Sequence, residues 1–122
     1  MSGRWDEERE RSMIFVTGPL YAGKENYIRQ ALDLDDAAFA ACAVRDVQDL
    51  ALTDSLDVLA DRLAEKRVVI ATELGGGVVP IDPEQRARRE AAGRLACELA
   101  KRADTVIRVC CGLPQLLKGE WP

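Results

Sequence analysis

Short apolar runs alternate along this chain with segments that have one apolar face. Residues 13–17 (MIFVT), 68–72 (VVIAT) and 105–110 (TVIRVC) are rich in β-branched residues and apolar on both sides, which is typical of buried strands. Residues 24–32 (KENYIRQAL) follow the first run and have the composition of a helix. Strands that alternate with helices predict a parallel, doubly wound α/β sheet.

Two further segments carry apolar residues at the spacing of one helix face. The first segment, residues 53–67, predicts a helix that Thr53 can cap. Its first turn is acidic and its last turn is basic, which suits the helix dipole. In the second segment, Asp82 can cap a helix whose first position is Pro83, where the missing N–H costs nothing. The apolar stripes of these helices are Leu56, Leu59, Ala60 and Leu63, and Ala87, Ala91, Leu95 and Leu99.

Residues 35–46 (DDAAFAACAVRD) fit two interpretations. Their alanines favour a helix, whereas a short apolar run before Arg45 is equally typical of a second buried strand, which we favour. Residues 1–12 are charged and carry no apolar face, so we interpret them as an N-terminal arm. The 122-residue chain has the length of one domain, which we place at residues 13–122.

Charge and composition narrow the classes of function. The net charge of −4 argues against general binding to nucleic acid or to anionic membranes. No apolar run approaches the roughly 20 residues of a membrane span, and the start lacks a signal peptide, so we expect a cytoplasmic protein. The chain contains no histidine, which excludes histidine acid–base catalysis and phosphohistidine or nucleotidyl-histidine intermediates.

The loop after the first predicted strand has the pattern of a phosphate-binding loop. Gly18, Gly23 and Lys24 form G-x-x-x-x-G-K between a strand and a helix, which is the context that this motif requires. Backbone N–H groups and the helix N-terminus would face phosphate oxygens, and Lys24 would supply positive charge. We therefore expect a nucleotide, ATP or GTP, at this loop.

Glu25 stands where the motif usually has a serine or threonine whose hydroxyl binds Mg²⁺. Its carboxylate would repel a phosphate at about 4 Å by roughly 4 kcal/mol at an effective dielectric of 20. It can instead point away as an acid at the helix N-terminus, or bind the metal directly. The sequence leaves these three alternatives open.

Other candidate residues follow the remaining strands, because ligands in such sheets bind beyond the carboxyl ends of the strands. Asp46 follows the proposed second strand, and Glu73 leaves the strand at 68–72 as a candidate metal ligand or general base. Three consecutive glycines, including Gly75 and Gly77, indicate a loop with demanding geometry. Arg86 and Arg89 lie three positions apart near the start of the long helix. This spacing puts them on one helix face and is more typical of a solvated surface pair than of a binding site.

Parts of this sequence resemble a known family. VVIATELGGGVVP, followed by RARREAAGRLACELAKRADTVIRVCCGLPQLLKG, is similar to the C-terminal half of the adenosylcobinamide kinase/adenosylcobinamide-phosphate guanylyltransferase enzymes. The family motif Asn-Glu-x-Gly-x-Gly-x-Val-Pro is matched from Thr72 to Pro80, and MIFVTGPLYAGK resembles the family's opening strand and loop. The similarity covers roughly residues 13–32 and 68–119. Further matching positions are Arg86, Arg89, Gly93 and residues 112–114.

The resemblance implies a compact, RecA-like P-loop domain, reduced in size, that forms a homo-oligomer, usually a trimer. It implies phosphorylation of the cobinamide aminopropanol hydroxyl and then transfer of GMP to that phosphate, with a corrinoid as partner. Because the chain has no histidine, guanylyl transfer through a histidine intermediate is excluded. Three positions differ from the family pattern, namely Glu25 in place of the hydroxyl residue and Thr72 and Ala96 in place of asparagines.

Three hypotheses follow for the function. The first is a minimal nucleotide-dependent kinase in which Lys24 holds phosphates, Asp46 or Glu73 binds metal or orients the hydroxyl, and two arginines, Arg86 and Arg89, offset charge. The second is a non-catalytic accessory protein that binds nucleotide or corrinoid. The third is a structural, oligomerising relative. We favour the kinase, because the segment around Glu73 keeps so much of the family pattern.

Overall fold

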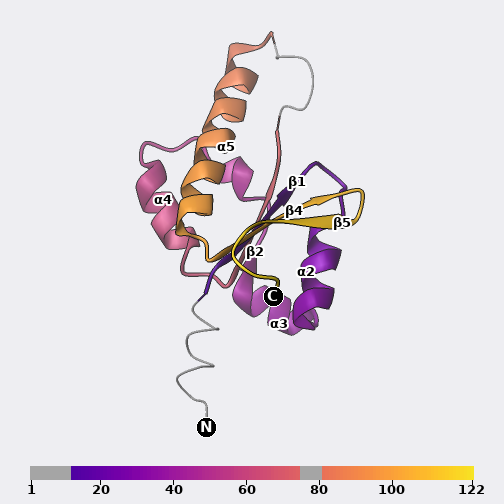
Figure 1. The fold of residues 1–122 in the computed structure, drawn as a ribbon. Helices are drawn as coiled ribbons and strands as arrows, with labels where there is room; N and C mark the ends of the chain where they lie inside the picture. The colour runs from indigo at the N-terminus through magenta and orange to yellow at the C-terminus, as the bar shows by residue number, and fades with distance from the viewer. Residues whose placement is uncertain (1–11, 75–80) are drawn as a thin grey trace.

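A five-stranded sheet forms the centre of the computed structural model, which describes residues 12–74 and 81–122. The strands run in the order β2-β3-β1-β4-β5, so the first strand lies in the middle (Figure 1). Neighbouring strands β2, β3, β1 and β4 are parallel to one another, and β5 is antiparallel to β4. The strands are β1 (Ile14–Gly18), β2 (Ala43–Val44), β3 (Val68–Thr72), β4 (Thr105–Cys110) and β5 (Leu113–Lys118).

Helices cover both faces of the sheet, as predicted for a doubly wound α/β fold (Figure 1). Side chains of β1 alternate between the two faces, because successive residues of a strand point to opposite sides. Phe15 packs in the core beneath α4 and α5, whereas Val16 packs in the core beneath α2 and α3. The helices are α2 (Lys24–Leu32), α3 (Asp36–Cys42), the short 3₁₀ helix η1 (Val47–Leu50), α4 (Leu56–Leu63) and α5 (Pro83–Arg102).

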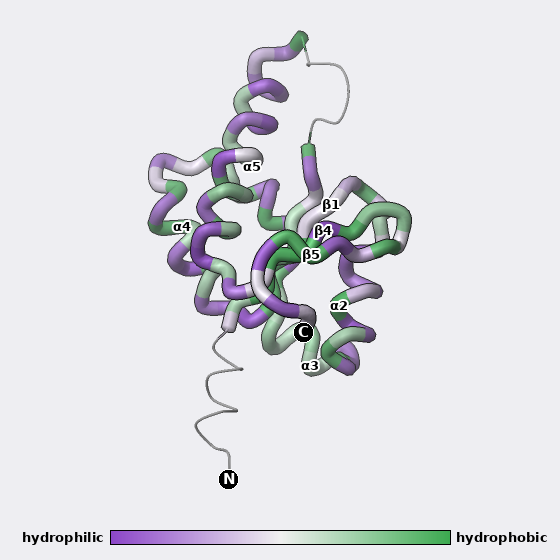
Figure 2. The backbone as a smooth tube through the Cα atoms, viewed as in Figure 1, coloured by the Kyte–Doolittle hydropathy of each residue, from purple (hydrophilic) through white to green (hydrophobic). Residues whose placement is uncertain are grey.

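The two cores are built from aliphatic side chains with two phenylalanines. Figure 2 shows the apolar residues concentrated in the strands and the polar residues on the outer sides of α4 and α5. The predicted stripe of α5 is buried at Ala91, Leu95 and Leu99, while Ala87 is exposed because the first turns of α5 extend beyond the sheet. No helix in residues 12–74 or 81–122 has the length and apolar character needed to cross a bilayer.

The helix starts follow the predicted capping chemistry with one correction. Asp82 caps α5, because its side chain accepts a hydrogen bond from the Glu84 N–H at 2.9 Å. For α4 the cap is Ser55 and not Thr53, since the Ser55 hydroxyl accepts from the Val58 N–H at 3.4 Å. The helix begins two residues later than predicted and ends at Leu63.

The favoured strand at residues 35–46 is wrong for most of that segment. Residues 36–42 form α3, which Asp35 caps by accepting a hydrogen bond from the Ala38 N–H at 2.8 Å. Only Ala43 and Val44 pair with β3, as a two-residue edge strand. Alanine's helix propensity and a good cap therefore prevail over the apolar run.

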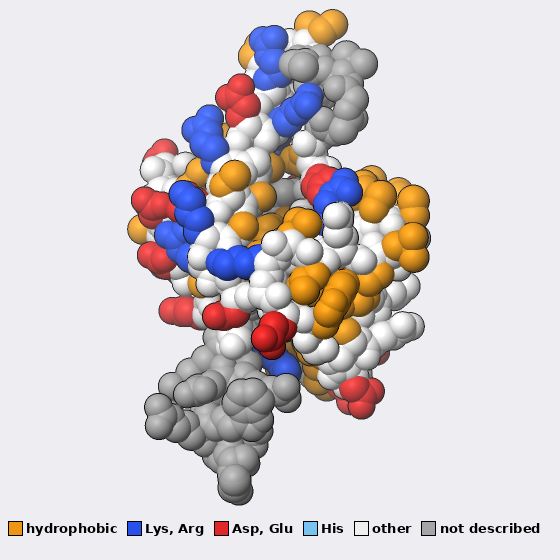
Figure 3. All heavy atoms as spheres, viewed as in Figure 1, with side chains coloured by type: hydrophobic (Ala, Val, Ile, Leu, Met, Phe, Trp, Pro, Cys, Tyr) orange, Lys and Arg blue, Asp and Glu red, His pale blue; other side chains and the backbone are white. Residues whose placement is uncertain are grey.

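Strand β5 was not predicted. It folds back on β4 through a tight turn at Cys111 and Gly112 and forms the far edge of the sheet. Leu116 packs against the core beneath α2, whereas Leu113 and Leu117 remain exposed. Figure 3 shows hydrophobic side chains gathered over this flank, where the β4–β5 hairpin and the loop after β1 lie.

Candidate functional site

The loop after β1 follows the carboxyl end of the central strand, and its conformation depends on glycines. Gly18 has φ +152°, and a Cβ atom there would overlap the carbonyl oxygen of Val109 on the neighbouring strand. Gly23 has φ +91° and forms the N-cap of α2, so it also adopts a conformation that other residues disfavour. The loop is tied to its neighbours by Glu73 N–H to Gly18 O (2.9 Å) and Gly112 N–H to Ala22 O (2.8 Å).

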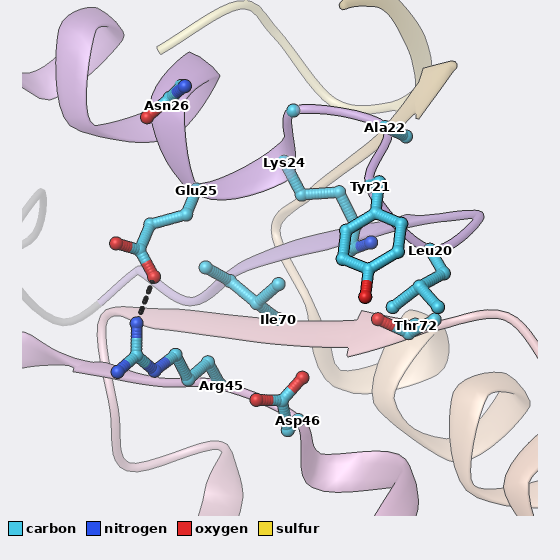
Figure 4. A pocket seen from close by; sticks show the side chains of 11 residues that line it. Leu20, Tyr21, Ala22, Lys24, Glu25, Asn26, Arg45, Asp46, Ile70 and Thr72 are labelled. Atoms are coloured by element: carbon cyan, nitrogen blue, oxygen red, sulfur yellow. Dashed lines mark hydrogen bonds and ion pairs between the residues drawn. The ribbon is translucent and has the colours of Figure 1, made fainter. Parts of the chain in front are cut away.

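A cavity of about 270 Å³ opens between this loop, the start of α2 and the residues after β2 (Figure 4). It therefore lies beyond the carboxyl ends of β1, β2 and β3, where ligands bind in sheets of this type. Its lining combines cations, acids and apolar side chains. The residues are Leu20, Tyr21, Ala22, Gly23, Lys24, Glu25, Asn26, Arg45, Asp46, Ile70 and Thr72.

Lys24 is buried, with only 8% of its surface exposed. Its ammonium group donates a hydrogen bond of 2.7 Å to the Pro19 carbonyl, so the side chain folds back over its own loop. Burial lowers the pKa of Lys24, and the negative charges of Asp46 and Glu73 act in the opposite direction. A buried cation at the N-terminus of a helix would gain from an anionic ligand, which would replace part of its lost hydration.

Glu25 lies in the first turn of α2 and makes two ion pairs. Its Oε1 accepts from Arg45 Nη1 at 2.6 Å, and its Oε2 accepts from Arg29 Nε at 3.1 Å. Figure 4 shows the carboxylate directed toward the Arg45 guanidinium across the mouth of the cavity. Both carboxylate oxygens are therefore engaged by arginines in this structure.

Glu73 is engaged in a similar way by the neighbouring strand. Its two carboxylate oxygens accept hydrogen bonds from Arg108 Nε at 2.7 Å and Arg108 Nη2 at 2.9 Å. This bidentate contact raises the pKa of Arg108 above its ordinary value. Glu73 does not line the loop cavity but an adjacent one of about 120 Å³ under α5, and Thr72 lines both.

Asp46 differs from the other two acidic candidates. It lines the loop cavity in a left-handed backbone conformation, with φ +57°. In the part of the chain that the structure describes, its carboxylate makes no hydrogen bond or ion pair, although its charge acts on Lys24. Asp46 is therefore the candidate acid whose oxygens face the cavity without an arginine on them.

Other predicted site residues lie apart from this cavity. Gly75 and Gly77 fall outside the described residues. Arg86 is exposed on the projecting first turns of α5, and Arg89 is half-buried three residues later. Neither arginine lines the cavity beside Lys24. The structure thus gathers Lys24, Glu25 and Asp46 and leaves the two arginines elsewhere.

Two arginines that bind the acidic candidates, Arg45 and Arg108, were not predicted from the sequence as functional residues. Arg45 is 20 residues from Glu25, and Arg108 is 35 residues from Glu73, so neither pair leaves a local spacing signal. Arg108 carries one indirect sign, because it is a lone charged residue inside an otherwise apolar strand. A charge in that position needs a partner beyond the strand.

The acidic residues fit a magnesium ion only in a limited way. In sites that transfer phosphate, Mg²⁺ is commonly held by one or two carboxylates together with phosphate oxygens and waters. Asp46 could supply one carboxylate, while Glu25 and Glu73 are occupied by arginines. Within residues 12–74 and 81–122, no three acidic or thiol side chains form a metal-binding group. A Mg²⁺ ion bound with a nucleotide would offset phosphate charge and would be held mainly by phosphate oxygens and waters, because the acidic candidates offer at most one carboxylate without an arginine partner, Asp46.

The fold and the loop define a small P-loop-like α/β domain. The chain belongs to the cobinamide kinase/cobinamide phosphate guanyltransferase family, whose sequence pattern matches residues 34–117. The match includes Asp46 and Glu73 and begins after the glycine-rich loop. A comparison with curated proteins finds no match. Membership confirms the resemblance drawn from the sequence and indicates a role in cobalamin biosynthesis, in a family whose chemistry is nucleotide-dependent kinase or guanylyltransferase activity.

Proposed function

We propose that this protein binds ATP or GTP through its glycine-rich loop and acts as a minimal kinase on a cobinamide-like corrinoid, without histidine-dependent guanylyl transfer. The observation that carries the proposal is the buried Lys24 beside a cavity at the N-terminus of α2. Family membership supplies the class of acceptor, a corrinoid with a free hydroxyl. The absence of histidine from the chain removes the residue on which a nucleotidyl-histidine intermediate would form.

Each residue has a defined task in this proposal. Lys24 and the N–H groups of the loop bind phosphate oxygens and offset their charge. Asp46 accepts a hydrogen bond from the acceptor hydroxyl, orients its oxygen toward the terminal phosphate, and takes the hydroxyl proton as that oxygen attacks. Leu20 and Tyr21, which are exposed at the rim of the cavity, offer apolar surface to a large acceptor.

Asp46→Asn tests the assigned acid. We expect transfer of the terminal phosphate from ATP or GTP to cobinamide to fall about 100-fold, because an amide cannot accept the hydroxyl proton as a carboxylate does. Nucleotide affinity should be retained, since the change removes a negative charge from the cavity. Radiolabelled transfer and calorimetry measure the two quantities. Asp49→Asn, an exposed acid on η1, is the control and should leave both unchanged. Full transfer by Asp46→Asn would contradict the assignment.

A second candidate function has a specific observation in its favour. Arginines occupy the carboxylates of both Glu25 and Glu73, which reduces the acids available for metal-dependent transfer. A non-catalytic accessory protein that binds nucleotide needs Lys24 and the loop alone. Nucleotide binding by the wild-type protein with no detectable phosphate transfer to cobinamide would favour this candidate over the kinase.

A further inference from the structure

The ion pairs around Glu25 differ in how firmly they are held. Arg29 donates to Glu25 on one side and to Asp36 at 2.7 Å on the other, and its guanidinium lies 4.3 Å from the centroid of the Phe39 ring. These contacts come from α2 and α3 and fix Arg29 in place. Arg45 has a 61% exposed side chain and donates to Glu25 through a single nitrogen, Nη1. Arg45 is therefore the more easily displaced partner.

In the arrangement described, the charges that line the cavity offer an anion no net attraction. Lys24 and Arg45 are positive, Glu25 and Asp46 are negative, and their formal charges cancel. If Arg45 turns from Glu25 to a phosphate, Glu25 keeps Arg29 as its counter-charge, and the phosphate then meets two cations. A guanidinium suits this task because its N–H groups match two phosphate oxygens at once.

We propose that Arg45 is a second phosphate-contacting residue of the loop cavity, and that Glu25 is the counter-charge that holds it at the cavity mouth and not a metal ligand. This inference rests on the proposed nucleotide binding and deepens it. A metal ion on Glu25 would have to displace two arginine contacts, and it would then lie beside the positive charge of Arg45. Turning Arg45 to a phosphate breaks one ion pair, and Glu25 then keeps Arg29 as its partner.

The two roles for Glu25 predict changes of opposite sign. We expect Glu25→Gln to strengthen the binding of inorganic triphosphate, ATP and GTP several-fold, because it removes a like charge and releases Arg45. Arg45→Gln should weaken the same binding by about 10- to 100-fold, the effect of losing a charge-assisted hydrogen bond. Both effects should appear with Mg²⁺ and with EDTA. Calorimetry measures the affinities, and circular dichroism checks that each variant is folded.

The double variant Glu25→Gln/Arg45→Gln distinguishes a direct contact between Arg45 and phosphate from an indirect effect of Arg45 through Glu25. If Arg45 touches phosphate, Arg45→Gln still weakens binding when Glu25 is already neutral. If Arg45 only restrains Glu25, the second substitution has no further effect, which overturns the proposal. Arg88→Gln is the matched control, because Arg88 is also an exposed arginine paired with a glutamate, Glu84, and lies away from the cavity.

The remaining outcomes distinguish this inference from the proposed function. If Glu25→Gln weakens binding only when Mg²⁺ is present, Glu25 is a metal ligand and the inference is wrong while nucleotide binding stands. If Arg45→Gln binds like the wild type, the inference is also wrong by itself. If the wild-type protein binds neither triphosphate nor nucleotide in either buffer, the proposed function fails and this inference fails with it.

Discussion

Gly18→Ala is expected to destabilise the protein by about 4 kcal/mol, which combines backbone strain at positive φ with overpacking. At φ +152° the new Cβ would overlap the Val109 carbonyl oxygen, and this atom belongs to the backbone of β4, which cannot move away without breaking the sheet. For a domain of this size the midpoint of thermal unfolding should fall by roughly 20 °C. Urea and thermal denaturation followed by circular dichroism measure the loss.

Gly93→Ala is the matched control for that substitution. Gly93 lies within α5, and a Cβ there would meet no atom within 4 Å. The same change should therefore stabilise the protein by about 1 kcal/mol through helix propensity and a less flexible unfolded chain. Equal effects at the two positions would show that the close approach of the first loop to β4 does not constrain Gly18.

Lys24→Met is expected to reduce nucleotide affinity by about 100-fold while making the ligand-free protein more stable. The affinity falls because a charge-assisted contact with phosphate is lost. Stability rises because an apolar side chain of similar length replaces a cation that is almost completely buried. Calorimetry with ATP and GTP gives the first quantity, and urea denaturation gives the second. Unchanged affinity would remove Lys24 from the site.

The stability gained by Lys24→Met should depend on pH in a defined direction. Burial lowers the pKa of Lys24 in the folded protein, so the folded state binds fewer protons than the unfolded chain between the two pKa values. The wild type therefore gains stability relative to the variant as pH rises through that alkaline window. The difference between their unfolding free energies should shrink there and stay constant at neutral pH. A difference that grew with pH would mean that burial does not penalise the Lys24 charge.

The parts of the fold that could be predicted are those with strong local signals. Strands β1, β3 and β4 are apolar on both faces, and α5 begins with an acid followed by proline, so the sequence alone locates them. Residues 36–42 were predicted wrongly because alanines and one phenylalanine suit a helix and a buried strand alike. Strand β5 was missed because proline, glutamine and lysine interrupt its three leucines at a sheet edge, and neither alternation nor a continuous apolar run results in these six residues.

The residues of the candidate site also divide into those that a local sequence motif reveals and those that only the folded sheet reveals. Gly18, Gly23 and Lys24 form a contiguous motif, and Glu25 is noticed because it interrupts that motif. The roles of Arg45 and Arg108 depend on which strands are neighbours, because each meets a glutamate from a distant part of the chain. Strand order is a property of the whole sheet, so residue spacing could indicate the Glu25–Arg29 pair, four residues apart in α2, but not the contacts that Arg45 and Arg108 make.

The hydrogen bond from the Gly112 N–H to the Ala22 carbonyl gives the molecule a built-in spectroscopic reporter. One end of the bond is in the glycine-rich loop, and the other is in the turn of the β4–β5 hairpin, at the edge of the sheet. A ligand that moves the backbone at Ala22 would lengthen or shorten this bond. The Gly112 amide resonance can therefore record occupancy of the loop from a residue outside the cavity, with no label on the ligand.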